Sequence, residues 1–202
     1  MKQIIENSLK TSMSYQEYIN LVDNLTLTNS TTGPEKTEAL VNYTALNQRR
    51  MARWNKKLHL TESQKETVKA FNNQVIWLVL TESWCGDAAH IMPVINKVAE
   101  LSDNINLRVV LRDENLELMD LFLTNGGRSI PKLIMLDAKS HDVIGTFGPR
   151  PSAATQMVND YKETHGTLTP EFKEDLQLWY NKDKGQTIVK DLINLLPVNV
   201  FL

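Results

Sequence analysis

The sequence is poor in the residues that build disulfide frameworks and metal sites. Its 202 residues include one cysteine, Cys85, and four histidines. A single cysteine cannot form an intramolecular disulfide, which argues against a disulfide-stabilised secreted protein. These residues lack the spacing of a zinc site, and no Gly-rich phosphate loop or Ser/His/Asp signature is present. We therefore expect neither a metal site nor a cofactor.

Long hydrophobic runs and a strong charge of one sign are missing as well. The longest apolar run covers residues 75–80, far short of the ~20 residues that a membrane-spanning helix needs. Residues 1–6 lack the apolar stretch of a signal peptide. A net charge of -2 provides no general attraction to nucleic acid or to anionic membranes. These absences predict a cytoplasmic protein that binds neither nucleic acid nor a membrane.

The sequence does contain a change of pattern near residue 61. Before this point, apolar residues recur at helical spacing, and residues 26–36 form a polar linker with turn formers. After it, residues 75–80 form the continuous apolar run that is typical of a strand buried on both faces of a sheet. Three further strands are predicted over residues 105–111, 133–136 and 143–147.

Helical patterns separate most of these strands, and the predicted order from residue 61 is α-β-α-β-α-β-β-α. Strands separated by helices are expected to pair in parallel, and the last two strands to add an antiparallel hairpin. A further helical segment is expected over residues 169–196. The chain is thus predicted to have a helical N-terminal extension (1–60), a mixed α/β core (61–165) and a helical C-terminal extension (166–202).

The stretch most informative about chemistry is Trp-Cys-Gly-Asp-Ala at residues 84–88, where the first strand turns into a helix. It resembles the thioredoxin superfamily, which carries Trp-Cys-Gly-Pro-Cys at this turn and a helix-kinking proline eight residues after the first cysteine. Cys85 and Pro93 have this spacing. Asp87 stands in place of the family proline, and Ala88 in place of the second cysteine. Within the superfamily, the string is similar to that of a bacterial group of thioredoxin-like proteins.

Two downstream positions extend the resemblance, which covers about residues 61–165. The superfamily places a cis-proline opposite the active cysteine at the start of a strand, and Ile130-Pro131 occupies the corresponding place. Gly148 matches a family glycine after the last strand. The resemblance implies a thioredoxin-like three-layer α/β/α fold with a mixed central sheet, plus helical N- and C-terminal additions. It also implies that Pro131 exposes the preceding backbone for pairing with an extended peptide.

Opposing influences act on the thiol of Cys85. A thiol at a helix N-terminus faces unpaired N–H groups and the positive end of the helix dipole, and both favour the nucleophilic thiolate. The negative neighbours Asp87 and Glu82 raise a thiol pKa, so the sequence leaves the sign of the net shift open. The buried aspartate that the family carries six residues before the first cysteine is replaced here by Val79.

The missing second cysteine restricts the mechanism. Dithiol reduction needs a resolving thiol, and Ala88 cannot supply one. Cys85 can still form a mixed disulfide that an outside thiol resolves, so a protein or small-molecule thiol or disulfide is the expected partner. The competing hypothesis is a non-catalytic thioredoxin-fold binding or adapter module, and whether the chain is an enzyme stays open at this stage. The candidate site comprises the catalytic residues Cys85 and Pro131 and the binding residues Trp84, Gly86, Asp87 and Ile130.

A basic cluster on the second predicted helix has two interpretations. One is a site for an anion or an acidic partner, and the other is a solvated helix face, which we expect. The cluster comprises Arg49, Arg50, Arg53, Lys56 and Lys57. His90 lies five residues after Cys85, about 140° around the helix, and is expected to pack rather than to act as a base.

Overall fold

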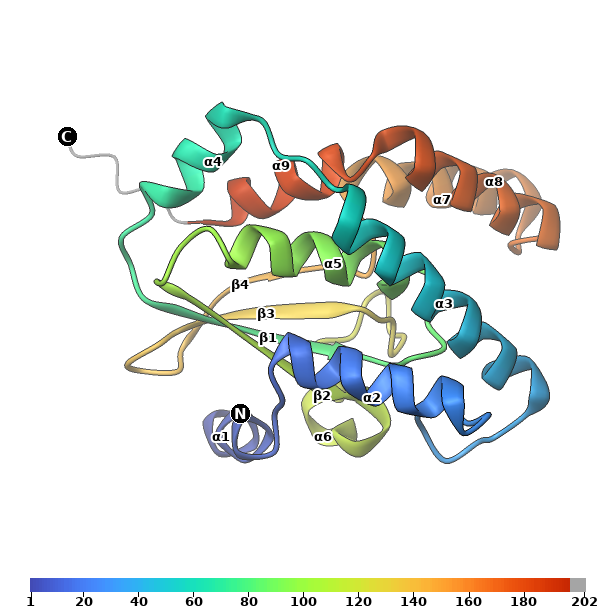
Figure 1. Cartoon of the computed structure of the whole chain (residues 1–202), viewed down its shortest axis with the longest axis horizontal. Coiled ribbons are helices and arrows are strands. Elements are labelled where there is room, and N and C mark those ends of the chain that lie inside the picture. The colour runs from blue at the N-terminus through green and yellow to red at the C-terminus, as the bar shows by residue number, and fades with distance from the viewer. Residues whose placement is uncertain (197–202) are drawn as a thin grey trace.

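The computed structural model describes residues 1–196 and places four strands in one mixed sheet of order β2-β1-β3-β4 (Figure 1). The strands are β1 (Val75–Thr81), β2 (Ile105–Leu111), β3 (Lys132–Asp137) and β4 (Val143–Phe147). β1 pairs with β2 in parallel, and β3 pairs in antiparallel orientation with both β1 and β4. β1 is buried along almost its whole length, as its continuous apolar run predicts.

The prediction that helix-separated strands pair in parallel is right for β1 and β2 and wrong for β1 and β3. Between β2 and β3, the chain forms only a 3₁₀ turn, η1 (Arg112–Glu114), and a five-residue helix, α6 (Leu116–Asp120). A parallel connection must carry the chain back along the sheet to the end where the previous strand began. At about 1.5 Å per residue, α6 is too short for this return. Residues 121–131 do not complete the return either, because Lys132 at the start of β3 pairs with Leu80, which also pairs with Val110 near the end of β2. β3 therefore runs in the opposite direction.

Helices cover both faces of the sheet. α5 lies over one face, in contact with α3 and α9, and α1 and α6 lie on the other side (Figure 1). The remaining bounds are α1 (Lys2–Lys10), α2 (Tyr15–Leu27), α3 (Glu38–Lys57), α4 (Glu62–Lys69), α5 (Ala88–Ala99), α7 (Ser152–His165), α8 (Pro170–Asp183) and α9 (Gln186–Leu195). None of the helices within residues 1–196 has the length and apolar character needed to cross a membrane.

Local sequence signals set several helix ends. At the start of α4, the Thr61 hydroxyl accepts a hydrogen bond from the Gln64 N–H, and the Gln64 side chain accepts one from the Thr61 N–H. This is the capping box that a threonine followed three residues later by a glutamine favours. The Thr169 hydroxyl caps α8 by accepting a hydrogen bond from the Phe172 N–H, at the start of the helical segment expected over residues 169–196. The helical segment after it divides into α8 and α9 because Lys184 and Gly185 adopt left-handed conformations with φ of 55° and 77°.

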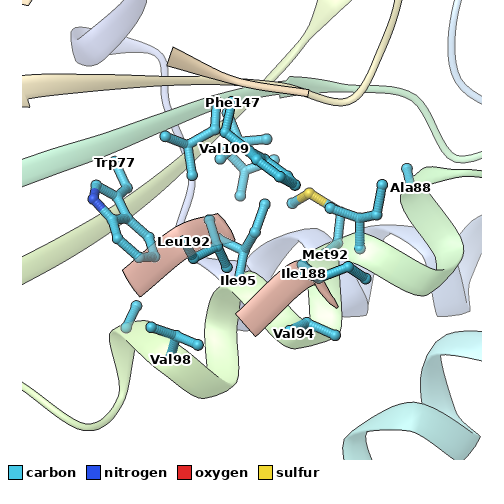
Figure 2. Close-up of a cluster of buried hydrophobic side chains, with 14 of the residues drawn as sticks. Trp77, Ala88, Met92, Val94, Ile95, Val98, Val109, Phe147, Ile188 and Leu192 are labelled. Carbon is cyan, nitrogen blue, oxygen red and sulfur yellow. The ribbon is translucent and has the colours of Figure 1, made fainter. Parts of the chain in front are cut away.

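α5 is the central helix of the core, and nearly all of its side chains are buried. Its apolar residues pack between the sheet residues Trp77 and Val109 and the α9 residues Ile188 and Leu192 (Figure 2). α9 also contacts β4. The C-terminal helices are therefore part of the packing that fixes α5. The turn at the N-terminal end of α5 is held by the sheet on one side and by the C-terminal helices on the other.

The segment between α1 and α2 bridges the outer edge of β2 at one position, Val109. The Met13 N–H donates a hydrogen bond to the carbonyl oxygen of Val109 over 2.8 Å, and the Val109 N–H donates to the carbonyl oxygen of Met13 over 2.7 Å. The N-terminal helices are thereby attached to the sheet at its edge.

Candidate functional site

Cys85 lies in the turn between β1 and α5, three residues before α5 begins at Ala88. The residue is 8% exposed. Its thiol donates a hydrogen bond to the backbone carbonyl oxygen of Ile130, with 3.3 Å between sulfur and oxygen. The peptide bond between Ile130 and Pro131 is cis. The structure thus brings together Cys85, Ile130 and Pro131, three residues of the candidate site.

Burial controls the ionisation of Cys85. It raises the pKa of the thiol from the ordinary value of 9.0 to about 12, and the negative charge of Asp87 adds to the increase. The backbone N–H groups of Ala88 and Asp87 and the positive charge of Arg150 oppose this increase without compensating it. The sequence leaves the direction of the net pKa shift open, and the structure gives an increase. Cys85 is therefore a protonated thiol near neutral pH.

Asp87 connects the start of α5 to two segments far along the chain. Nη2 of Arg150 lies 2.7 Å from Oδ2 of Asp87. The hydroxyl of Tyr180, from α8, donates a hydrogen bond to Oδ1 over 2.9 Å. Burial raises the pKa of the Asp87 carboxyl above its ordinary value, and Arg150 and the Tyr180 hydrogen bond offset only part of this increase. Asp87 is thus an anchor for α8 and for the segment after β4, and its carboxylate is not free to act as a base.

A close backbone contact positions the segment that carries Arg150. Gly148 has a φ of +107°, and a Cβ atom at this position would lie 2.2 Å from the carbonyl oxygen of Pro131. Both the conformation and the distance require glycine. The chain after β4 therefore packs directly on the residue that precedes β3, and this contact brings Arg150 to Asp87.

His90 lies one turn further along α5 and is buried. Nε1 of Trp54 donates a hydrogen bond to Nδ1 of His90 over 2.8 Å, and Nε2 of His90 lies 2.7 Å from Oε1 of Gln177. Because Nδ1 accepts a hydrogen bond, the neutral imidazole carries its proton on Nε2 and donates it to Gln177. Burial lowers the pKa of His90 to about 4. The Tyr180 ring stacks on the imidazole with 4.5 Å between centroids, so His90 packs α3 and α8 onto α5.

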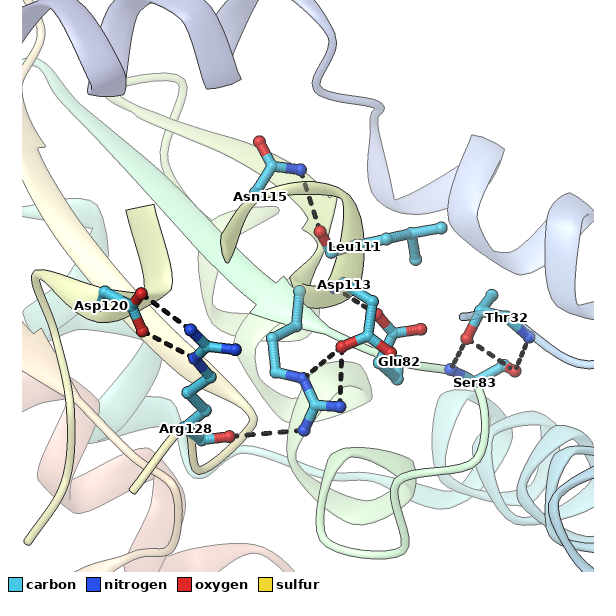
Figure 3. A network of polar contacts seen from close by, with 9 residues as sticks. Thr32, Glu82, Ser83, Leu111, Asp113, Asn115, Asp120 and Arg128 are labelled. Carbon is cyan, nitrogen blue, oxygen red and sulfur yellow. Dashed lines mark hydrogen bonds and ion pairs between the residues drawn. The ribbon is translucent and has the colours of Figure 1, made fainter. Parts of the chain in front are cut away.

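A polar cluster holds the other side of the turn (Figure 3). The Ser83 N–H donates a hydrogen bond to Oγ1 of Thr32 over 2.9 Å, and Oγ of Ser83 lies 2.8 Å from Oγ1 of Thr44. Oε1 of the buried Glu82 accepts a hydrogen bond from the Asp113 N–H over 2.9 Å. Burial raises the pKa of this carboxyl. The turn that carries Cys85 is therefore fixed by buried contacts with the segment before α3 and with α3 itself, and by a partly buried contact with η1, directly after β2.

Trp84 and Gly86 flank Cys85 in the chain and are partly exposed. The guanidinium carbon of Arg112 lies 4.9 Å from the centroid of the Trp84 ring, in a cation–π contact. A pocket of about 330 Å³ adjoins this pair, with Trp84, Arg112 and Leu116 in its wall. Of the candidate binding residues, Trp84 thus faces a surface pocket, whereas Asp87 is engaged inside the protein.

Three side chains that complete the site are not predicted from the sequence: Arg150, Gln177 and Tyr180. The cap at Thr169 predicts that a helix begins there, but no local pattern tells which face of that helix meets α5. These side chains reach Asp87 and His90 only because the C-terminal helices pack over the start of α5.

The site contains few chemically reactive side chains. Cys85 carries the one thiol of the chain, and this thiol is protonated; His90 is neutral and hydrogen-bonded at both ring nitrogens. In the part of the chain that the structure describes, no group of three or more His, Cys, Asp or Glu side chains is arranged to hold a metal ion. The arrangement fits exchange chemistry at one thiol, or a binding role in which the thiol serves only as a hydrogen-bond donor.

Comparison with known proteins agrees with the fold described above. A family model described as thioredoxin matches residues 33–162, well over half of the chain. A crystal structure of a protein of unknown function from Pseudomonas aeruginosa is similar with a TM-score of 0.59 and 21% sequence identity, covering 75% of this chain and 84% of that chain. An HIV epitope scaffold is similar with a TM-score of 0.56 and 20% identity, covering 76% of this chain and 88% of that chain. No curated protein matches the sequence significantly.

Proposed function

Because this chain belongs to the thioredoxin family, we propose that it carries out thiol–disulfide exchange through Cys85 alone. The observation that carries the proposal is the 3.3 Å contact between the sulfur of Cys85 and the carbonyl oxygen of Ile130. The nucleophile thus lies beside a backbone segment to which a substrate can dock by main-chain hydrogen bonds. The substrate class is a disulfide, in a protein or in a small molecule.

Bonds and protons balance in the proposed step. The Cys85 thiolate attacks one sulfur of the substrate disulfide, a new S–S bond forms, and the old S–S bond breaks with release of the other half as a thiolate. The proton that Cys85 loses passes to solvent or to the released thiolate. Ala88 begins α5 as a buried residue without a thiol, so a second thiol from outside must attack the mixed disulfide and regenerate Cys85.

The high pKa makes Cys85 slow toward reagents that do not dock. A docked disulfide gains from proximity and orientation, and such gains reach several powers of ten in well-oriented reactions. We therefore expect the site to discriminate strongly between a disulfide that docks beside Ile130 and a reagent that only collides with the sulfur.

A second candidate function is a binding or adapter module without catalysis. The burial of Cys85 favours it, because a thiol with a pKa of about 12 is well suited to a permanent hydrogen bond with Ile130. In this alternative, the sulfur has the role of a packing and hydrogen-bonding group, and its chemistry is unused.

The two functions differ in their effect on thiol–disulfide exchange. We would follow the exchange between 2-mercaptoethanol and a cystine-containing peptide by chromatography, with catalytic amounts of protein. The proposed function predicts an acceleration that is lost in Cys85→Ser. If the wild type and Cys85→Ser give the same rate as the protein-free control, the binding module is the better conclusion.

A further inference from the structure

Arg50 is held beside the turn that carries Cys85. It belongs to α3, and its side chain is partly buried. Nη1 of Arg50 donates a hydrogen bond to Oδ1 of Asn47 over 3.2 Å. Asn47 is completely buried, and its side-chain amide donates to the carbonyl oxygen of Ser83 over 2.9 Å. Two consecutive hydrogen bonds therefore fix the guanidinium of Arg50 relative to the Cys85 turn.

The guanidinium of Arg50 lies over Gly86, the residue that follows Cys85. A Cβ atom at Gly86 would lie 3.9 Å from Nη1 of Arg50 and 4.0 Å from Nε2 of Gln177. Oε1 of Gln177 is engaged by His90, which leaves the amide nitrogen directed elsewhere. A guanidinium from α3 and an amide from α8 thus present N–H donors to the same small volume beside the sulfur-bearing residue.

The positive charge of Arg50 has no carboxylate partner among residues 1–196. The acidic residue of the turn, Asp87, is already paired with Arg150 and hydrogen-bonded by Tyr180. Burial and the charge of Arg53 both lower the pKa of Arg50, which is the sign of an uncompensated cation. A partly buried cation without an anion is unfavourable, and an anion that binds beside it removes this cost.

We propose that Arg50 and Gln177 bind a carboxylate of the substrate, and that the substrate is an anionic disulfide of low molecular weight. This inference rests on the proposed exchange at Cys85 and specifies the substrate of that site. For Arg50 it adopts the anion-site interpretation of the basic cluster, in place of the solvated helix face that is expected from the sequence. A compact molecule suits the site, because the donors from α3 and α8 lie 3.9 Å and 4.0 Å from the same point, the position of a Cβ atom on Gly86.

Three small disulfides that share a two-carbon arm but differ in charge test the proposal. They are 3,3′-dithiodipropionate (anionic), bis(2-hydroxyethyl) disulfide (neutral) and cystamine (cationic). The rate at which each forms a mixed disulfide with Cys85 is measured by intact mass spectrometry and divided by its rate with a cysteine peptide. Charge-assisted hydrogen bonds of ordinary strength predict a normalised preference for the anion over the cation of about tenfold or more.

Variants of the same helix isolate the contribution of Arg50. Arg50→Gln should reduce the preference to about twofold or less, and Arg50→Lys should retain part of it because the charge remains. Arg49→Gln is the matched control, since it removes the same charge from an exposed neighbour and should leave the preference unchanged. High salt should weaken the preference of the wild type.

The outcomes separate the inference from the function on which it rests. If all three disulfides react at equal normalised rates, or if Arg49→Gln has the same effect as Arg50→Gln, the anion site is refuted while exchange at Cys85 stands. If none of the three forms a mixed disulfide with the folded protein, the proposed exchange itself is refuted. Circular dichroism of each variant verifies that the fold is intact.

Discussion

The buried thiol of Cys85 should react more slowly than a free cysteine at neutral pH. A pKa of about 12 in place of 9.0 lowers the thiolate fraction at pH 7 by about 10³, because each pH unit counts tenfold. A more basic thiolate is also a better nucleophile, and a Brønsted coefficient of about 0.4–0.5 returns a factor of about 15 to 30. The net expectation is a rate about 30 to 60 times lower than that of a cysteine peptide.

Iodoacetamide is a suitable reagent, because it is small and neutral and has no disulfide to dock. Since Cys85 is the one cysteine of the chain, the mass of the alkylated protein reports this residue alone. Between pH 7 and pH 10 the rate should rise about tenfold per unit without levelling off, whereas the rate of a cysteine peptide levels off above about pH 9. A plateau below pH 9, or a rate above that of the peptide at pH 7, would refute the assigned protonation state.

Removing the charge of Asp87 should change this rate in a definite direction. Its carboxylate raises the thiol pKa, so Asp87→Asn should lower that pKa and speed up alkylation at pH 7. Asp120→Asn is the matched control, because Asp120 is an exposed carboxylate paired with Arg128 (Figure 3). Equal rates in the two variants would show that the charge of Asp87 does not act on the sulfur.

Three further predictions follow from the packing of the site. Ala88→Cys should form an intramolecular disulfide with the native cysteine under mild oxidant, because both positions flank the start of α5; two free thiols after oxidation, counted by mass after alkylation, would contradict this geometry. The free energy of unfolding, measured in urea, should decrease as the pH falls from about 6.5 to about 4, because His90 takes up its proton at a higher pH in the unfolded chain than in the folded one. Between pH 7 and pH 4.5 the wild type should lose about 2 to 3 kcal/mol more than His90→Gln. A parallel pH dependence in the two proteins would exclude His90 as the source. Gly148→Ala should cost about 3 kcal/mol or more because of the contact with Pro131, whereas Gly166→Ala, with nothing within 4 Å, should cost about 1 kcal/mol; equal urea midpoints would contradict the close approach.

Features that depend on a few neighbouring residues are predicted well from this sequence. The apolar run of β1 and the capping box of Thr61 and Gln64 are examples, because burial on two faces and an N-cap each leave a local pattern. The turn of residues 84–88 is placed correctly between β1 and α5 for the same reason. This turn and the order of the elements predict the thioredoxin family, and the family model that matches residues 33–162 confirms that prediction.

Features that depend on contacts far along the chain are not predictable in this way. The antiparallel direction of β3 depends on the path of the chain between β2 and β3, whereas the apolar pattern of the strand is the same for either direction. The pKa of Cys85 depends on how deeply the folded chain buries the sulfur, which neighbouring charges do not reveal. From its neighbours in the sequence, Asp87 is an ordinary carboxylate at the start of a helix. Its partners Arg150 and Tyr180 lie after β4 in the chain, so the sequence around Asp87 does not reveal them.

The bridge between Met13 and Val109 has a consequence for association with other chains. An uncovered edge strand offers its free N–H and C=O groups to any extended peptide, and this is a common route both to regulated complexes and to aggregation. The paired hydrogen bonds of Met13 occupy that route at β2. A partner strand that adds at β2 would therefore have to displace Met13, whereas no isolated bridge within residues 1–196 involves β4, at the opposite margin.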